Sequence, residues 1–119
     1  MQTFNITFRD LTFPVVTNAD NLDQETIELG LDCLLPPKEL IPTGIELILV
    51  DCLNNDRGTQ WTLHFSITNE AWPNLDPGFV EDFASDIKDY ILENEEGLPS
   101  IKTIIDYDYR TLTIIYHAG

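Results

Sequence analysis

The chain of 119 residues carries 21 acidic side chains against 6 basic ones, a formal net charge of −15 at pH 7, and 43% of its residues are hydrophobic. That hydrophobic content argues against a disordered acidic tail, and the length predicts one folded domain spanning residues 1–119, with a core large enough to be stable without disulfides or a structural metal. The excess of acid argues against nucleic acid or an anionic membrane as a direct ligand, because both need lysine and arginine to neutralise phosphate. It favours a basic protein as the partner.

Localisation and cofactors follow from what the sequence lacks. The N-terminal residues include neither a basic start nor an apolar run of secretory length, and no stretch approaches the ~18 apolar residues of a membrane-spanning helix. We therefore expect a cytoplasmic protein. Cys33 and Cys52 each lie in an apolar stretch and are expected to be reduced core thiols. Neither belongs to a CxxC pair or to a Cys–His cluster of zinc spacing, so no metal or cofactor is expected.

The first quarter of the chain predicts strands and a loop. Residues 4–8 alternate apolar and polar side chains, which is typical of a half-buried strand. Residues 11–15 continue the alternation, either as a second strand or as the same strand beyond a bulge, and Pro14 would confine that strand to an edge. Residues 18–25 are polar and turn-forming, which indicates a loop or a frayed helical turn.

The next segment is open to two interpretations. Residues 27–33 alternate apolar and polar side chains and predict a strand, although a helix over 20–34 remains an alternative. Pro36 and Pro37 end the element in either case. Residues 38–41 are expected to form a single helical turn.

A hairpin is predicted in the middle of the chain. Residues 45–53 are apolar on both sides apart from Glu46 and Asp51, which is typical of a central strand covered on two faces. Turn-forming residues 54–58 follow. Residues 61–68 then alternate, which predicts the second strand of the hairpin with one face in water.

The clearest helix signal covers residues 76–96. Asp76 is a suitable N-cap, Pro77 fits the first helical position, and Gly97 and Pro99 mark the end. Apolar residues recur between them at three- and four-residue spacing, so this stripe must pack on a sheet or on another helix. The stripe comprises Phe79, Val80, Phe83, Ile87 and Ile91, with Ala84 and Tyr90 beside it.

The C-terminal residues predict a second hairpin with a turn at 107–110. In this hairpin Ile101, Thr103 and Ile105 are expected to pair with Leu112, Ile114 and Tyr116. Strands without regular βαβ repetition predict an α+β fold, with a mostly antiparallel sheet of about five to seven strands and one main helix over about 76–96 packed on one face.

The other side of the predicted helix carries a row of carboxylates. The row comprises Asp82, Asp86, Asp89, Glu93 and Glu96, and Glu81 and Glu95 lie beside it. A rise of ~1.5 Å per residue gives the row a length of roughly 20 Å. Like charges four residues apart cost ~0.2–0.5 kcal/mol per pair, and Lys88, the only base in the helix, is not spaced to pair with the row. A face that served only solubility would use Glu–Lys pairs, so unpaired acid indicates a cationic partner.

Candidate groups for catalysis or metal binding are few. Only His64 and His117 offer acid–base chemistry near neutral pH. Asp106 and Asp108, with Asp10 or Asp51 nearby, would offer oxygen ligands to a divalent cation. An enzymatic or metal-dependent function would need these groups to converge in a pocket. We expect no enzyme, and we expect Asp106 and Asp108 to extend the acidic face past Glu96.

In its acidity, its fold class and its unpaired row, the chain resembles two groups of proteins. One is the bacterial and phage DNA-mimic proteins, whose surface acids imitate backbone phosphates. The other is the immunity proteins of toxin systems, including contact-dependent inhibition, which neutralise basic nuclease toxins. The first resemblance implies a non-enzymatic inhibitor of a DNA-binding protein, nucleoid protein or nuclease, and the second implies a cognate toxin. One row resembles one DNA strand, so a second row is needed, from Asp20, Asp23, Glu25 and Glu28 or from Asp106 and Asp108.

Overall fold

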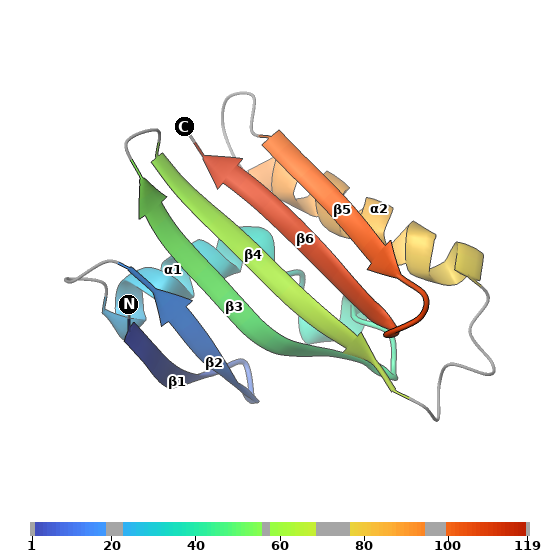
Figure 1. The fold of residues 1–119 in the computed structure, drawn as a ribbon, viewed down its shortest axis with the longest axis horizontal. Coiled ribbons are helices and arrows are strands. Elements are labelled where there is room, and N and C mark those ends of the chain that lie inside the picture. The colour runs from blue at the N-terminus through green and yellow to red at the C-terminus, as the bar shows by residue number, and fades with distance from the viewer. Residues whose placement is uncertain (1, 19–22, 56–57, 69–76, 95–99, 119) are drawn as a thin grey trace.

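The computed structural model describes residues 2–18, 23–55, 58–68, 77–94 and 100–118. It has an α+β fold, in which one six-stranded, mostly antiparallel sheet is ordered β1-β2-β3-β4-β6-β5 and helices pack on one of its faces (Figure 1). The predicted fold class is confirmed. The strands are β1 (Gln2–Phe8), β2 (Leu11–Thr17), β3 (Ile45–Asn55), β4 (Gly58–Ile67), β5 (Ser100–Asp106) and β6 (Thr111–Ala118). The helices are α1 (Gln24–Leu34) and α2 (Pro77–Asn94). The single helical turn predicted over 38–41 is present as a 3-10 turn, η1 (Lys38–Leu40).

The first two strands form a hairpin. Arg9 and Asp10 turn the chain with positive φ angles of 50° and 67°, the backbone of a tight two-residue hairpin turn. Residues 11–15 therefore begin a second strand. Pro14 was wrongly expected to place that strand at an edge, because β2 lies between β1 and β3. The proline is tolerated because β2 pairs with β3 only from Val15 to Thr17, so its missing N–H falls outside that ladder.

The strand β3 has a bulge that explains its apolar sequence. The register with β4 shifts between Leu47, opposite Phe65, and Leu49, opposite His64. The extra residue moves Leu49 to the face opposite that of Leu47, so both faces of the strand read as apolar. The expectation that both faces are covered was wrong: Ile48 is 45% exposed and Leu49 is only partly buried.

Residues 24–34 form α1, so the strand predicted there was wrong and the helical alternative was right. Asp23 caps the helix by accepting a hydrogen bond of 2.8 Å from the Thr26 N–H. Hydrogen bonds from the Thr26 side chain and from this N–H lower the pKa of Asp23. Ile27, Leu31 and Leu34 are buried, whereas Leu29 is 63% exposed. These buried positions follow the helical period, and the chain leaves the helix at Leu35, before the two prolines.

The α2 helix packs on the sheet through most of the predicted stripe. The buried residues are Val80, Phe83, Ala84, Ile87 and Ile91. Phe83 meets Phe65 of β4 edge-to-face, with ring centroids 5.7 Å apart. Phe79 was also expected in the stripe but is 43% exposed. The expected cap Asp76 and the expected end at Gly97 lie outside the described residues.

Both helices lie behind the sheet in Figure 1 and contact each other. The terminal hairpin has the predicted register, with Ile101 opposite Tyr116, Thr103 opposite Ile114 and Ile105 opposite Leu112. In the part of the chain that the structure describes, the other face of the sheet has no helix over it. Neither described helix combines the length and the apolar character needed to cross a membrane.

Candidate functional site

The described part of the acidic row lies on the outer side of α2. Asp82, Asp86, Asp89 and Glu93 are all exposed, on the side of the helix opposite the buried stripe. No ion pair joins any of these carboxylates to a described base, and Lys88, on the same helix, forms none. Glu96, which was predicted to continue the row, and Glu95, which was predicted to lie beside it, are outside the described residues.

A second set of acids lies on α1. Glu25 and Asp32 are exposed and Glu28 is partly buried, and α1 lies beside α2 on the same face of the sheet. Asp23 belongs to the same set in sequence but caps the helix. Among the described residues, the helical layer thus carries acids on both of its helices.

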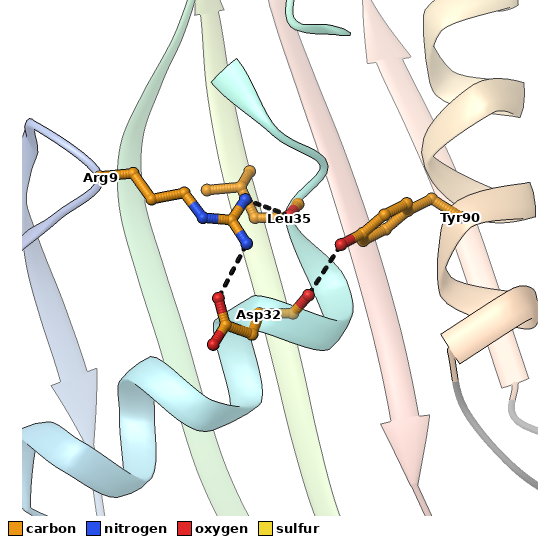
Figure 2. Close-up of polar contacts among 4 residues, drawn as sticks. All are labelled: Arg9, Asp32, Leu35 and Tyr90. Atoms are coloured by element: carbon orange, nitrogen blue, oxygen red, sulfur yellow. Dashed lines mark hydrogen bonds and ion pairs between the residues drawn. The ribbon is translucent and has the colours of Figure 1, made fainter. Parts of the chain in front are cut away.

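A polar junction fixes how the two helices meet (Figure 2). The Tyr90 hydroxyl donates a hydrogen bond of 2.8 Å to the backbone carbonyl of Asp32. The Asp32 carboxylate accepts from Arg9 at 2.8 Å, and the same guanidinium donates to the Leu35 carbonyl at 2.9 Å. Asp86 and Glu93, four residues before and three after Tyr90, flank this contact along α2. The junction therefore holds α1 next to the acidic row.

The turn after β5 lies at the first turns of α2. The Tyr107 hydroxyl donates a hydrogen bond of 2.9 Å to Glu81, and this bond raises the pKa of Tyr107. We expected Asp106 and Asp108 to extend the acidic face past Glu96. This was wrong, because β5 runs back along α2 and brings the turn to the Glu81 end of the helix.

The candidate catalytic and metal-binding residues do not converge. The Asp106 carboxylate accepts hydrogen bonds of 3.0 Å from the N–H groups of Asp108 and Tyr109, so it shapes its own turn. Asp51 instead contacts His64 Nε2 at 2.9 Å. His64 lies opposite Thr113, four positions from His117 on β6, which places the two histidines ~13 Å apart. Among the described residues, no group of three or more His, Cys, Asp or Glu is arranged to hold a metal ion.

Two features were not predicted. One is a hollow of about 250 Å³ where β2 and β3 separate, lined by Leu11, Ile41, Pro42, Thr43, Gly44, Ile45, Glu46 and Leu47. Its lining is mostly apolar and includes none of the predicted site residues. The other is the Asp51–His64 pair. Counting back from the turn at 54–58 places Asp51 opposite Thr62, one diagonal step from His64, so the hairpin register is the signal that predicts this contact.

No protein-family model, curated protein or solved structure matches the chain.

Proposed function

We propose that the protein is a non-enzymatic binding module that acts as a DNA mimic and occupies the nucleic-acid-binding surface of a basic DNA-binding protein or nuclease. The observation that carries this proposal is the exposed row of Asp82, Asp86, Asp89 and Glu93, which has no cationic partner among the described residues. Oriented carboxylates accept short, charge-assisted hydrogen bonds from arginine and lysine. The negative electrostatic field of the row also attracts a basic partner and raises the rate of association.

The geometry of the helical layer supports mimicry of a polyanion. From Asp82 to Glu93 the row spans ~16 Å, with a charge about every 5 Å, a spacing that suits one phosphate strand better than two. Glu25 and Glu28 on α1 supply a second line, and packed helices lie ~8–10 Å apart. The junction through Tyr90 and Asp32 keeps the carboxylates of the two helices in a fixed relative position before the partner binds, so binding costs little conformational entropy.

The proposal predicts the behaviour of a triple variant, Asp86→Asn/Asp89→Asn/Glu93→Gln. Removing three carboxylates takes away the charge-assisted bonds, so binding should weaken by at least about tenfold. Relief of like-charge repulsion along α2 should raise the melting temperature by roughly 1–4 °C. The partner is first captured on the immobilised protein from an extract of its native host, and affinities are then measured by calorimetry.

The matched control is Asp10→Asn/Glu39→Gln/Glu46→Gln, which removes three exposed carboxylates from other surfaces. The net charge changes equally in the two variants, so a loss of affinity confined to the first locates the contact on α2. If the first variant binds as tightly as the parent protein, the row is only solvated surface and the proposal fails.

A second candidate function is that of an immunity protein which neutralises a cognate nuclease-type toxin. The exposed tyrosines of the turn after β5 favour it: Tyr107, which contacts Glu81, is 43% exposed, and Tyr109 is 81% exposed. Aromatic anchors carry much of the binding energy in tight protein–protein interfaces. Duplex DNA separates the two functions, because it should displace a mimic from its partner but not an immunity protein bound beside the active site of its toxin. In the second case Tyr109→Ala should weaken binding more than the triple variant does.

A further inference from the structure

The sheet face opposite the helices, called the open face below, is a broad surface with little net charge. Cross-strand pairing aligns its side chains in rows, one of which runs through Leu49, His64, Thr113 and Ile104, from β3 to β5. The next row runs through Val16, Asp51, Thr62, Ile115 and Lys102. Threonines and aliphatic side chains dominate both rows. Ile104 is 42% exposed, while Leu49 and Ile115 are partly buried.

Charge is divided unequally between the two sides of the sheet. The described helices carry the acidic rows. On the open face Asp51 is paired with His64, and the remaining described charges are those of Glu46, Lys102 and Asp106, of which Asp106 is bound within its own turn. The open face is therefore the surface through which two highly acidic molecules approach with the least repulsion.

We propose that two copies of this chain pack back to back through the open faces of their sheets. Six strands about 4.8 Å apart, each about seven residues long at ~3.3 Å per residue, give a flat area of roughly 650 Å². Because the side chains make the face uneven, its accessible area is larger than this flat area and approaches the ~800 Å² that each partner buries in a stable interface. Twisted sheets stack in this way with side chains interdigitated over ~10 Å, which suits the threonine and aliphatic rows.

The same geometry separates the charged layers of the dimer. The two helical layers lie on the outer sides, behind two sheets about 10 Å apart, so their acids are roughly 30 Å from each other. This distance is comparable to the Debye length of ~30 Å at 0.01 M salt but exceeds the ~8 Å at physiological ionic strength, so added salt removes most of the repulsion between the two layers. Salt therefore strengthens the dimer, whereas it weakens the binding of a basic partner to the acidic row. Because salt is expected to affect dimerisation and partner binding in opposite directions, the dimer can be tested independently of the proposed function.

The test is sedimentation of the full chain and of two double variants over a range of concentrations. Ile104→Lys/Thr113→Lys adds two charges to the open face, and Leu29→Lys/Leu92→Lys adds the same charge to the helices at aliphatic side chains that are 63% and 45% exposed. Both variants lower the net negative charge equally, so general repulsion falls in both. We expect the parent and the helix variant to dimerise more tightly as NaCl rises to about 0.5 M, and the sheet variant to dissociate at least tenfold more readily.

Circular dichroism verifies that each variant is folded, and Ile104→Lys alone replaces the double variant if Thr113→Lys unfolds the sheet. Three outcomes overturn the inference: a parent protein that stays monomeric at about 500 μM in 0.5 M NaCl, a dimer that survives the sheet substitutions unchanged, or a dimer that salt dissociates. If the parent is monomeric and the sheet variant loses only binding to a captured partner, the face is occupied by that partner instead of by a second copy.

Discussion

At the scale of single residues, Gly30 decides how closely α1 approaches the sheet. A Cβ built on Gly30 would lie 2.5 Å from Cζ2 of Trp61, a ring that is 8% exposed and cannot easily move. The glycine costs ~1 kcal/mol of helix propensity relative to alanine. The close approach explains why that cost is accepted here, in the middle of a helix.

We expect Gly30→Ala to lower the free energy of unfolding by roughly 1 kcal/mol, because overpacking of ~1–3 kcal/mol outweighs the gain in propensity. Urea denaturation measures the effect. The matched control is the same substitution in a Trp61→Phe background, where the clashing ring is gone and alanine should be neutral or stabilising. An equal loss in both backgrounds would show that contact with Trp61 is not the cause.

At the scale of elements, the Arg9 junction joins the β1–β2 hairpin to α1, and Tyr90 joins α1 to α2. The Arg9 guanidinium bonds a carbonyl just beyond the C-terminus of α1, where a cation also suits the helix dipole. It also lies 4.7 Å from the centre of the Phe8 ring. The side chain of Arg9 is 28% exposed and that of Asp32 is 55% exposed, so solvent screens their ion pair and the bond to Leu35 contributes more.

Arg9→Met keeps the aliphatic stem and removes the charge. We expect it to lower the free energy of unfolding by about 1–2 kcal/mol and the melting temperature by roughly 4–8 °C, because the Leu35 carbonyl loses its donor. Asp32→Asn should cost less than about 1 kcal/mol, since that hydrogen bond to the carbonyl remains. Thermal unfolding of both single variants and of the double variant measures the coupling. If Asp32→Asn lowered the free energy of unfolding as much as Arg9→Met, the ion pair alone would account for the stabilisation by the junction.

The two elements that were misread show where sequence patterns stop being informative. In α1, residues 27–33 fit an alternation as well as a helical period, and glycine at position 30 is unfavourable in the middle of either element. The contact that requires this glycine is with Trp61, which lies in a different part of the sequence. In β3 the bulge at Ile48 made a strand with one covered face look covered on both. In both cases the deciding interaction is tertiary.

The acidic row was easier to place than its surroundings. Helical period alone puts Asp82, Asp86 and Asp89 on one side of α2, and the structure places them exposed there. The position of Asp106 depended on the direction of β5 relative to α2, which the sequence does not encode locally. The Asp51–His64 pair depends only on the hairpin register, so it could have been predicted by counting residues back from the turn.

At the scale of the whole molecule, a formal net charge of −15 makes the folded state repel itself. We expect the melting temperature to rise with NaCl, and to rise by a similar amount with millimolar magnesium or calcium at matched ionic strength, because crowded carboxylates attract any cation. Scanning calorimetry in the three salts measures this. A micromolar, metal-selective rise that disappears in Asp106→Asn/Asp108→Asn would instead establish a specific metal site.

The strand order of the sheet also governs how the chain completes its fold during synthesis. Strand β6 follows β5 along the chain but lies between β4 and β5. A nascent chain that ends at β5 therefore has no neighbour for that strand, and the β4 edge, including Leu63 opposite the later Ile114, stays unpaired. The β4 edge is protected from aggregation only when residues 111–118 have left the ribosome and entered the gap.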